Sequence, residues 1–380
     1  MVITRRAPIS HDNHFDPAID AFLRFLRALY VRGEPQAVTL WTAPDNAPLS
    51  VILTHDVDFT GSVPRMRAYA RLEHAEGVSA TYFIQTKYIK DWEDRAFFDH
   101  TAIRDLGQIT SLGMSLGSHS VAHAPDFARF AVGSGRERYP DYLPFVAGPH
   151  DTRHASILGE LRVSRFLLRH FAPTQTVRAF RAGYLLKPVA LPQALAAAGY
   201  RYDSSATADE SLTHLPFQLD YSRGYRQEVS VFEFPITLGD GVKPSLLAYY
   251  PHALRLVREL GQYGAVCVVL IHPNVVGDKY AFEQRFLHAL KGHAWIGSLG
   301  AFGSWWRARN AASVAVTSTG HQEAVTIDLP LRIRGLTLQV PQGWRLAHTY
   351  DRVRQSGVRV VLPEEQGRVT LHFVRPHAHG

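Results

Sequence analysis

Cysteine and methionine are scarce in this sequence of 380 residues. The chain contains three Met and one Cys, Cys267, which sits in the apolar run 266–270. A single cysteine excludes internal disulfides and zinc sites built from several cysteines, so Cys267 reads as a small buried apolar residue. Any metal site must therefore use histidine and carboxylate side chains, and 20 His are available.

Long hydrophobic segments are also missing. The longest apolar run, residues 265–271, is far too short to cross a bilayer, so we expect no transmembrane segment. No apolar stretch like that of a signal peptide follows the first residues, because the segment around His11 and His14 is polar. The chain as given therefore reads as cytoplasmic, whereas trimming of upstream residues would leave an extracytoplasmic location open.

Basic residues outnumber acidic ones, and the formal net charge is +7. Residues 301–380 contain ten Arg and five acidic residues, so most of the excess lies there. These Arg alternate with apolar residues, which favours a solvated strand face over a surface for nucleic acid or another anionic polymer. We therefore expect no nucleic-acid partner.

The two ends of the chain differ from its centre in the spacing of their apolar residues. Residues 1–45 carry one amphipathic helix, which we expect to pack on the outside of the main domain. Its apolar residues recur at helical spacing: Ala18, Phe22, Phe25, Leu26 and Leu29. Residues 311–380 alternate apolar and polar residues between turn signals, which predicts a small antiparallel β domain.

Short apolar runs alternate with longer amphipathic segments through residues 46–310. About eight such units predict a mostly parallel sheet that closes into a distorted (β/α) barrel, with an open doubly wound sheet as the alternative. Residues 124–154 lack periodicity, so we expect this long irregular segment to wall one side of a cleft. The expected strands are 51–56, 80–84, 115–118, 177–181, 200–203, 231–235, 266–272 and 294–298.

Two carboxylates end the first of these strands, in Thr54-His55-Asp56-Val57-Asp58. Strand side chains alternate between faces, so Asp56 and Asp58 point the same way. Paired carboxylates at the end of a buried strand are costly to desolvate unless they bind a cation or transfer protons. By itself the pattern is more typical of two solvated acids. A second motif shifts the interpretation toward a functional site.

That second motif is His119-Ser120-Val121-Ala122-His123, directly after the strand 115–118. If the chain turns helically here, the two imidazoles project to one side and can grip one metal ion. In a parallel barrel this strand end opens at the same rim as Asp58. Two His and one carboxylate leave coordination positions for water and substrate, as a hydrolytic metal requires.

Three more strand ends carry ionisable residues: Arg181, Asp203 and His272. A structural ion pair or a satisfied core histidine would explain each of them singly. Barrel active sites are assembled from such strand ends, so their recurrence favours one shared site. Arg181 at this rim can hold a carboxylate in its ionised form.

In this order and context, the five motifs resemble those of the polysaccharide deacetylase family, the NodB-like enzymes of carbohydrate esterase family four. They are Thr54–Asp58, His119–His123, Arg181–Tyr184, Asp203 with its neighbours, and Leu270–His272. The resemblance covers roughly residues 45–310 and implies a distorted barrel. It also implies a metal-dependent hydrolase that removes N-acetyl groups from amino sugars of a polysaccharide.

The resemblance implies a role for each matching residue. His119, His123 and Asp58 would bind the metal, with Zn²⁺ as the expected ion. Asp56 would be the catalytic base, Arg181 would orient it, and His272 would be the general acid. Asp203 would tune His272, and the backbone near Tyr184 would contact the substrate oxyanion. Val57 separates two Asp that are adjacent in most of the family, so the reverse assignment of Asp56 and Asp58 stays open.

Two other functions fit the same residues. The Asp-Val-Asp pattern is similar to that of deformylases acting on lipid-linked aminoarabinose, so a C–N hydrolase for a small or lipid-linked amide is one alternative. The other is a non-catalytic carbohydrate-binding protein built on a degenerate barrel. The sequence specifies neither the glycan, the oligomeric state nor any protein partner.

Overall fold

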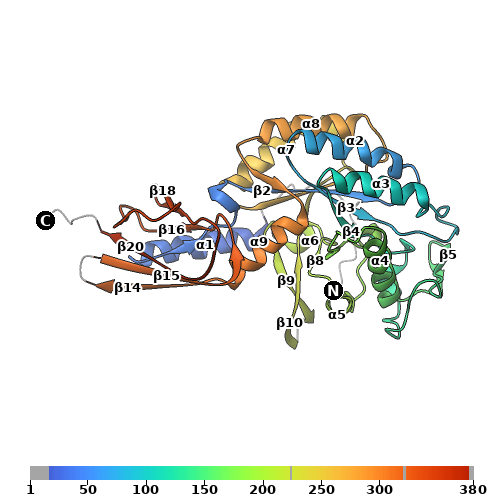
Figure 1. Ribbon diagram of the computed structural model, residues 1–380, viewed down its shortest axis with the longest axis horizontal. Helices are drawn as coiled ribbons and strands as arrows, with labels where there is room; N and C mark the ends of the chain where they lie inside the picture. Colours follow the sequence, from blue (N-terminus) through green and yellow to red (C-terminus); the bar gives the residue numbers. More distant parts are fainter. Residues whose placement is uncertain (1–16, 223–224, 320–321, 376–380) are drawn as a thin grey trace.

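A curled sheet of parallel strands forms the centre of the molecule (Figure 1). The computed structural model describes residues 17–222, 225–319 and 322–375, so parts of all three predicted regions lie outside the described residues. The sheet order is β11-β12-β2-β3-β4-β7-β8-β10-β9, and β13 pairs with β2. Every neighbouring pair is parallel except β9 and β10, which are antiparallel.

The central sheet is nearly closed into a barrel. Only Phe234 and Pro235 separate β10 from β11, so the chain passes directly from the β8 side of the sheet to the β12 side. A single parallel bridge between Thr207 and Ile236 joins these two sides. The distorted barrel predicted from the strand–helix alternation is therefore confirmed.

The strands of this sheet are shorter at several positions than the sequence predicts. Their bounds are β2 (Ser50–Val57), β3 (Thr81–Ile84), β4 (Ser115–Ser118), β7 (Ala179–Phe180), β8 (Tyr202–Asp203), β9 (Phe217–Ser222), β10 (Tyr225–Glu233), β11 (Ile236–Gly239), β12 (Val266–Ile271) and β13 (Trp295–Gly297). The apolar patterns that predict the other strands do not reveal β9 and β11.

Helices lie between these strands and cover the barrel. The first group is α2 (Ser62–Ala75), α3 (His100–Ser111), α4 (Ile157–Phe171) and α5 (Leu191–Ala198). The second is α6 (Ala208–Ser211), α7 (Leu246–Gly261), α8 (Asp278–Leu290) and α9 (Leu299–Ala311). Helices α2, α3, α7 and α8 bury apolar residues against the outer face of β2, β3 and β12, where Leu53, Tyr82 and Val269 lie in the core. In the described part of the chain, no helix is both long and apolar enough to span a membrane.

The irregular segment 124–154 has little regular structure. It contains the short 3-10 helix η2 (Phe127–Arg129) and a hairpin of β5 (Phe145–Gly148) and β6 (Asp151–Arg153). Other 3-10 turns are η1 (Pro44–Asn46) and η3 (Gly183–Leu185). As expected, the segment lines one side of the cavity described below.

The C-terminal region forms two small antiparallel sheets. One contains β14 (Ser313–Thr319), β15 (Gln322–Ile333), β20 (Glu365–Val374) and β17 (Arg345–Leu346); the other contains β1 (Thr39–Leu40), β16 (Thr337–Gln339), β19 (Arg359–Val361) and β18 (Arg354–Ser356). The predicted C-terminal β domain is confirmed, and a strand from near the N-terminus joins it. One apolar cluster runs from the barrel interior through Phe302 on α9 to Val325 and Leu371 in these sheets.

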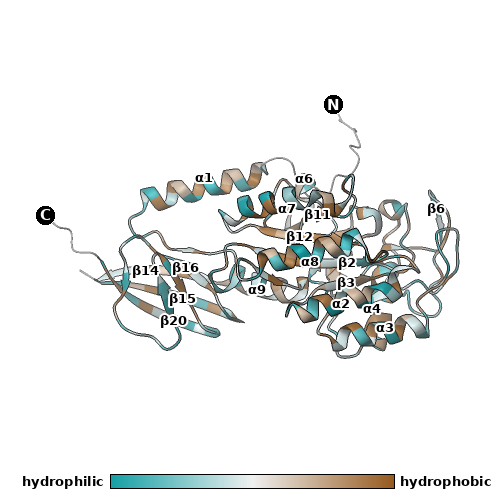
Figure 2. Ribbon diagram, turned by 90° about the horizontal axis from the view of Figure 1, so that it is seen from above, coloured by the Kyte–Doolittle hydropathy of each residue, from teal (hydrophilic) through white to brown (hydrophobic). Residues whose placement is uncertain are grey.

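Helix α1 (Ala18–Gly33) lies along one edge of the molecule (Figure 2). The predicted helix is present, and it lies on the outside as expected. Its apolar residues, however, do not face the protein: Phe22, Phe25 and Leu29 are at least half exposed.

Candidate active site

The carboxyl ends of five parallel strands meet at one rim of the barrel. The strand register places Asp56 beside Phe83 of β3, and Ser118 of β4 beside Phe180 of β7. Phe180 is in turn paired with Asp203 of β8. Since His119, Arg181 and His272 directly follow β4, β7 and β12, the topology delivers their side chains to the same place.

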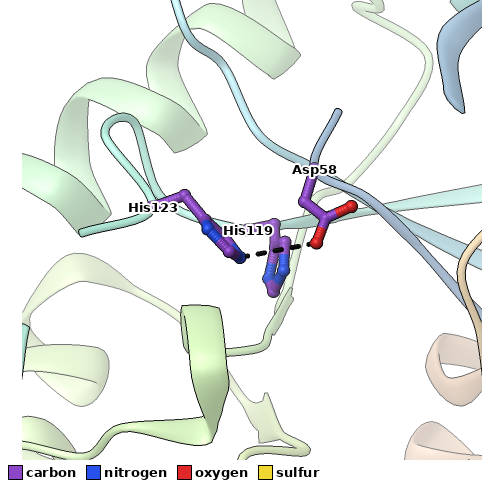
Figure 3. A group of neighbouring side chains, drawn as sticks. All are labelled: Asp58, His119 and His123. Atoms are coloured by element: carbon purple, nitrogen blue, oxygen red, sulfur yellow. Dashed lines mark ion pairs between the residues drawn. The ribbon is translucent and has the colours of Figure 1, made fainter. Parts of the chain in front are cut away.

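Asp58, His119 and His123 form a compact group at this rim (Figure 3). One ligand atom from each lies within 4.8 Å of the others. The Oδ2 atom of Asp58 is 3.6 Å from Nε2 of His123, and all three residues are buried. The structure therefore brings together the three residues that the sequence predicts as metal ligands.

The segment between the two histidines is an irregular loop and not the helical turn considered from the sequence. Ser120 and His123 have positive φ angles of 66° and 54°. Buried Glu160 on α4 fixes the loop, because its Oε2 atom accepts hydrogen bonds from the backbone N–H groups of Val121 and Ala122, both 2.8 Å long. The four-residue spacing thus brings the imidazoles together through loop geometry.

The chemistry of this group fits a divalent metal ion. Two imidazole nitrogens and a carboxylate are the ligand types of catalytic zinc sites. Asp58 Oδ1 is buried and has no hydrogen-bond partner among the described residues, so the carboxylate has an unused acceptor. Burial raises the pKa of Asp58 to about 6 and lowers that of His119 to about 3, because both charged forms lose solvation. A cation would compensate the carboxylate and bind the neutral imidazole.

Both imidazoles are oriented by their second ring nitrogen. Nδ1 of His119 lies 2.8 Å from the carbonyl oxygen of Arg181, and Nδ1 of His123 lies 3.1 Å from Oε1 of Glu93. Such partners fix the ring and leave Nε2 toward a metal. Glu93 also accepts a hydrogen bond from the Tyr184 hydroxyl at 2.7 Å. The sequence patterns do not single out Glu93, which lies outside any recognisable motif.

Arg181 holds Asp56 in a buried ion pair. Its Nη1 atom is 2.7 Å from Asp56 Oδ1 and donates to Thr54 Oγ1 at 2.9 Å, and the arginine is fully buried. Burial raises the pKa of Asp56, but the charges of Arg181 and His272 and the hydrogen bond from Arg181 outweigh it, so the pKa is lowered. Asp56 is therefore an ionised carboxylate whose other oxygen lies 3.8 Å from Nε2 of His119.

His272 reaches the site from the end of β12, with Nε2 3.5 Å from Asp58 Oδ2. Asp240, just after β11, holds this histidine: its two carboxylate oxygens lie 2.8 Å from His272 Nδ1 and from the His272 backbone nitrogen. Lys279 in turn lies 2.6 Å from Asp240. Burial lowers the pKa of His272, but the hydrogen bond and charge of Asp240 prevail and raise it to about 9.

Asp203 is not the carboxylate that contacts His272, although the resemblance implies that it tunes this histidine. Its Oδ1 atom accepts a hydrogen bond from Ser205 Oγ at 2.5 Å, and its carboxyl also interacts with that of buried Glu233. Burial raises the pKa of Asp203 to about 6 and that of Glu233 well above its usual value. The partner of His272 is Asp240, which the sequence did not reveal because β11 shows no strand pattern of its own. Asp203 instead lies buried beside Ser205 and Glu233.

A cavity of about 740 Å³ opens above these residues. Asp56, Asp58, His119, His123 and His272 lie at its base. Its wall is more apolar and comes from several loops: Phe59, Pro125, Arg129, His150, Tyr184, Leu185 and Leu186. The Phe59 and Tyr184 side chains are almost half exposed, which makes them available to a bound ligand.

A second buried group of ionisable residues lies on the other face of β2. His55 Nε2 is 2.7 Å from Glu73 Oε1 on α2 and 3.6 Å from Glu283 Oε2 on α8. Tyr82 donates a hydrogen bond to Glu73 at 2.8 Å. Burial and the charge of Glu73 raise the pKa of Glu283 well above its usual value, so a protonated Glu283 reduces the charge of this group.

Comparison with known proteins gives a fold relationship. No family model and no curated protein matches the sequence. The structure is similar to a putative polysaccharide deacetylase from Mycobacterium smegmatis, with a TM-score of 0.52 and 16% identity over 74% of this chain and 99% of that one. A chitin deacetylase from the fungus Colletotrichum lindemuthianum also matches, with a TM-score of 0.42 and 16% identity over 69% of this chain and 89% of that one.

A family 4 carbohydrate esterase from Streptomyces lividans, solved with acetate, matches with a TM-score of 0.36 and 16% identity over 65% of this chain and 89% of that one. The match to the Mycobacterium smegmatis protein confirms, at the level of the fold, the resemblance drawn from the five motifs: the chain shares the architecture of a putative polysaccharide deacetylase. Its buried Asp-His-His group could bind a metal ion.

Proposed function

We propose that this protein is a metal-dependent amidohydrolase that removes N-acetyl groups from the amino sugars of a polysaccharide. One observation carries the proposal: a buried Asp-His-His group, an ionised Asp56 and a protonated His272 converge at the base of one cavity. The fold shared with a putative polysaccharide deacetylase supports the same reaction class.

Asp58, His119 and His123 would hold the ion, which we propose to be Zn²⁺. Bound there, it supplies Lewis acidity, which polarises an amide carbonyl and lowers the pKa of water. The donor set and the free Asp58 Oδ1 are suited to this ion. Glu93 and the Arg181 carbonyl keep the two imidazoles in a fixed orientation.

Asp56 and His272 carry the proton transfers of the proposed reaction. Asp56 accepts a proton from the attacking water, and its ion pair with Arg181 keeps it ionised for that task. His272 gives a proton to the departing amine, which an amide needs because its anion is a very poor leaving group. Tyr184 lines the cavity wall, and a backbone N–H group near it would stabilise the developing oxyanion.

The direct test is hydrolysis of a panel of N-acetylated glycans, and of N-formylated amines beside them, by the zinc-loaded protein, with quantification of the acid released. Acetate is the expected product. Formate released from N-formylated amines would instead identify the deformylase alternative. Glycan binding without release of any acid would identify a carbohydrate-binding protein and overturn the proposal.

Two substitutions separate the proposed roles. Asp56→Asn should retain the metal and lower turnover by about 10²–10⁴-fold, because it removes the general base. His119→Ala should lose the metal, as measured by elemental analysis. Asp126→Asn is a matched control: this carboxylate lines the same cavity but bonds Thr152, so metal content and turnover should stay near wild type. Full turnover in Asp56→Asn would move the base elsewhere, most simply to Asp58.

A further inference from the structure

Helix α1 turns its polar side toward the molecule. Asp20 is almost completely buried and accepts a hydrogen bond from the Tyr263 hydroxyl at 2.9 Å and another from the His214 backbone N–H at 3.0 Å. The Thr213 hydroxyl donates to the second oxygen of the same carboxylate. Asp20 is the single buried residue of this helix, so a charged side chain is what anchors it.

Two arginines extend this polar contact along the helix. The guanidinium of Arg24 lies over the Tyr263 ring, 4.8 Å from its centre. That of Arg27 lies over the Trp41 ring, 5.1 Å from its centre, and bonds the Gln339 side chain. Asp20, Arg24 and Arg27 are spaced by four and three residues, so they form one stripe on the helix. This stripe faces the protein body.

The opposite side of α1 is apolar and exposed. Six large apolar side chains there are between 43% and 59% exposed: Ile19, Phe22, Phe25, Leu26, Leu29 and Tyr30. Leu23 and Val31 are also exposed, but the helical period places them nearer the polar side. An amphipathic helix on a globular protein normally buries its apolar side and exposes its charges. In α1 this arrangement is inverted, so the apolar side calls for a partner surface outside the chain described.

The apolar side has the spacing of a helix-packing seam. Phe22, Phe25, Leu26 and Leu29 follow each other at positions i, i+3, i+4 and i+7. No charged side chain interrupts this seam, because Asp20, Arg24 and Arg27 project to the protein body. Such a seam packs well against the same seam of another helix.

We infer that α1 is the interface of a homodimer in which two copies pack their α1 seams against each other. Each of the six side chains offers roughly 100 Å², about half the area of a large apolar residue. Two copies would therefore bury up to about 1,200 Å² in total, the lower end of the range for stable protein interfaces. A twofold axis perpendicular to the helices makes the seam self-complementary and places the two Arg32 at opposite ends.

Charge favours a second copy over a lipid surface. A helix that binds an anionic membrane combines its apolar face with basic residues that remain free to reach the headgroups. In α1, Arg24 and Arg27 are engaged with Tyr263 and Trp41, and Arg32 alone borders the seam. The seam therefore fits another apolar protein surface, and the simplest self-complementary one is its own copy.

The test compares the wild type with a double variant, Phe22→Glu with Leu29→Glu, by sedimentation equilibrium of the full chain. The wild type should be a dimer, and the double variant a monomer with unchanged turnover, because α1 does not line the cavity. Phe166→Glu is the matched control: this phenylalanine of α4 is 52% exposed but lies outside the seam, so the dimer should persist.

A second variant tests the geometry independently of any loss of folding. Phe25→Cys places a thiol in the seam of a protein whose native Cys267 is buried, so oxidation should give a covalent dimer in high yield. A wild type that is monomeric up to 100 times its working concentration would overturn the inference. So would a dimer that survives the double variant, or binding of the monomer to phosphatidylglycerol vesicles that the double variant loses.

Discussion

At the scale of single residues, the pairing of His272 with Asp240 defines a pH-dependent step. Asp240 raises the pKa of His272 to about 9, so the wild-type imidazole is protonated throughout the neutral range. Asp240→Asn removes the negative charge and should lower that pKa. We therefore expect the alkaline limb of the kcat profile to move to lower pH, because the general acid loses its proton earlier.

Asp203→Asn is the control for this pH profile, since Asp203 contacts Ser205 and not His272. Its alkaline limb should coincide with that of the wild type. A shift in Asp203→Asn and none in Asp240→Asn would restore the role that the sequence resemblance gives to Asp203. The geometry predicts a shift in Asp240→Asn and none in Asp203→Asn.

Glu283 provides a stability prediction, also at the residue scale. Its pKa is raised in the folded state, so the folded protein binds a proton that the unfolded chain releases near its ordinary value of about 4.3. Wild-type stability is therefore fully present below that pH and falls as the pH rises toward the folded-state pKa, with a limiting slope of about 1.4 kcal/mol per pH unit.

Glu283→Gln mimics the protonated acid at every pH. Its stability relative to the wild type should be unchanged near pH 4 and should increase as the pH rises, as measured by urea unfolding at several pH values. Glu259→Gln, at an exposed position on α7, should show no such trend. A Glu283→Gln variant that loses stability uniformly would mean that Glu283 is ionised.

At the scale of elements, the loop after β7 constrains the loop after β4. A Cβ atom on Gly183 would lie 2.6 Å from Cδ2 and 2.9 Å from Nε2 of His123. Gly183→Ala should therefore displace the imidazole and weaken metal affinity by about 10–100-fold, a typical effect of disturbing the surroundings of a metal ligand. Isothermal titration of the metal-free protein with Zn²⁺ measures this.

The control substitution is Gly148→Ala in the β5–β6 hairpin. A Cβ atom there meets nothing within 4 Å, and the backbone is not left-handed, so metal affinity should be unchanged. Equal affinity in Gly183→Ala would show that His123 tolerates displacement and is not a ligand.

Sequence patterns predict some of the site residues and miss others. Alternation predicts that Asp56 and Asp58 share a face, and parallel strands predict that His119, Arg181 and His272 share their rim. Asp240 escapes prediction because β11 is a four-residue strand that is placed by its pairing with β12 and by the bridge between Thr207 and Ile236. Long-range contacts of this kind have no local sequence signal.

At the scale of the whole molecule, local sequence patterns again predict the elements that flank the barrel but not the long-range contacts that place them. Period-two patterns predict the C-terminal β strands, but they cannot show that Thr39–Leu40 pairs with β16. Helical periodicity predicts α1, but not the face that it turns outward. That depends on Asp20 finding Tyr263, which lies 243 residues away along the chain.

The barrel and the C-terminal sheets should unfold together. Phe302 on α9 is fully buried in the apolar cluster that also contains Ile52 of the barrel and Val325 of the β sheets. Because the two parts share this core, we expect one cooperative transition, detected at the same denaturant concentration by far-UV circular dichroism and by tryptophan fluorescence.

Phe302→Ala should shift both signals together and lower the free energy of unfolding by about 3–5 kcal/mol. Phe166→Ala on the exposed face of α4 should leave the transition within about 0.5 kcal/mol of wild type. Two separate transitions in the wild type would mean that the α9 cluster does not couple the barrel to the C-terminal sheets.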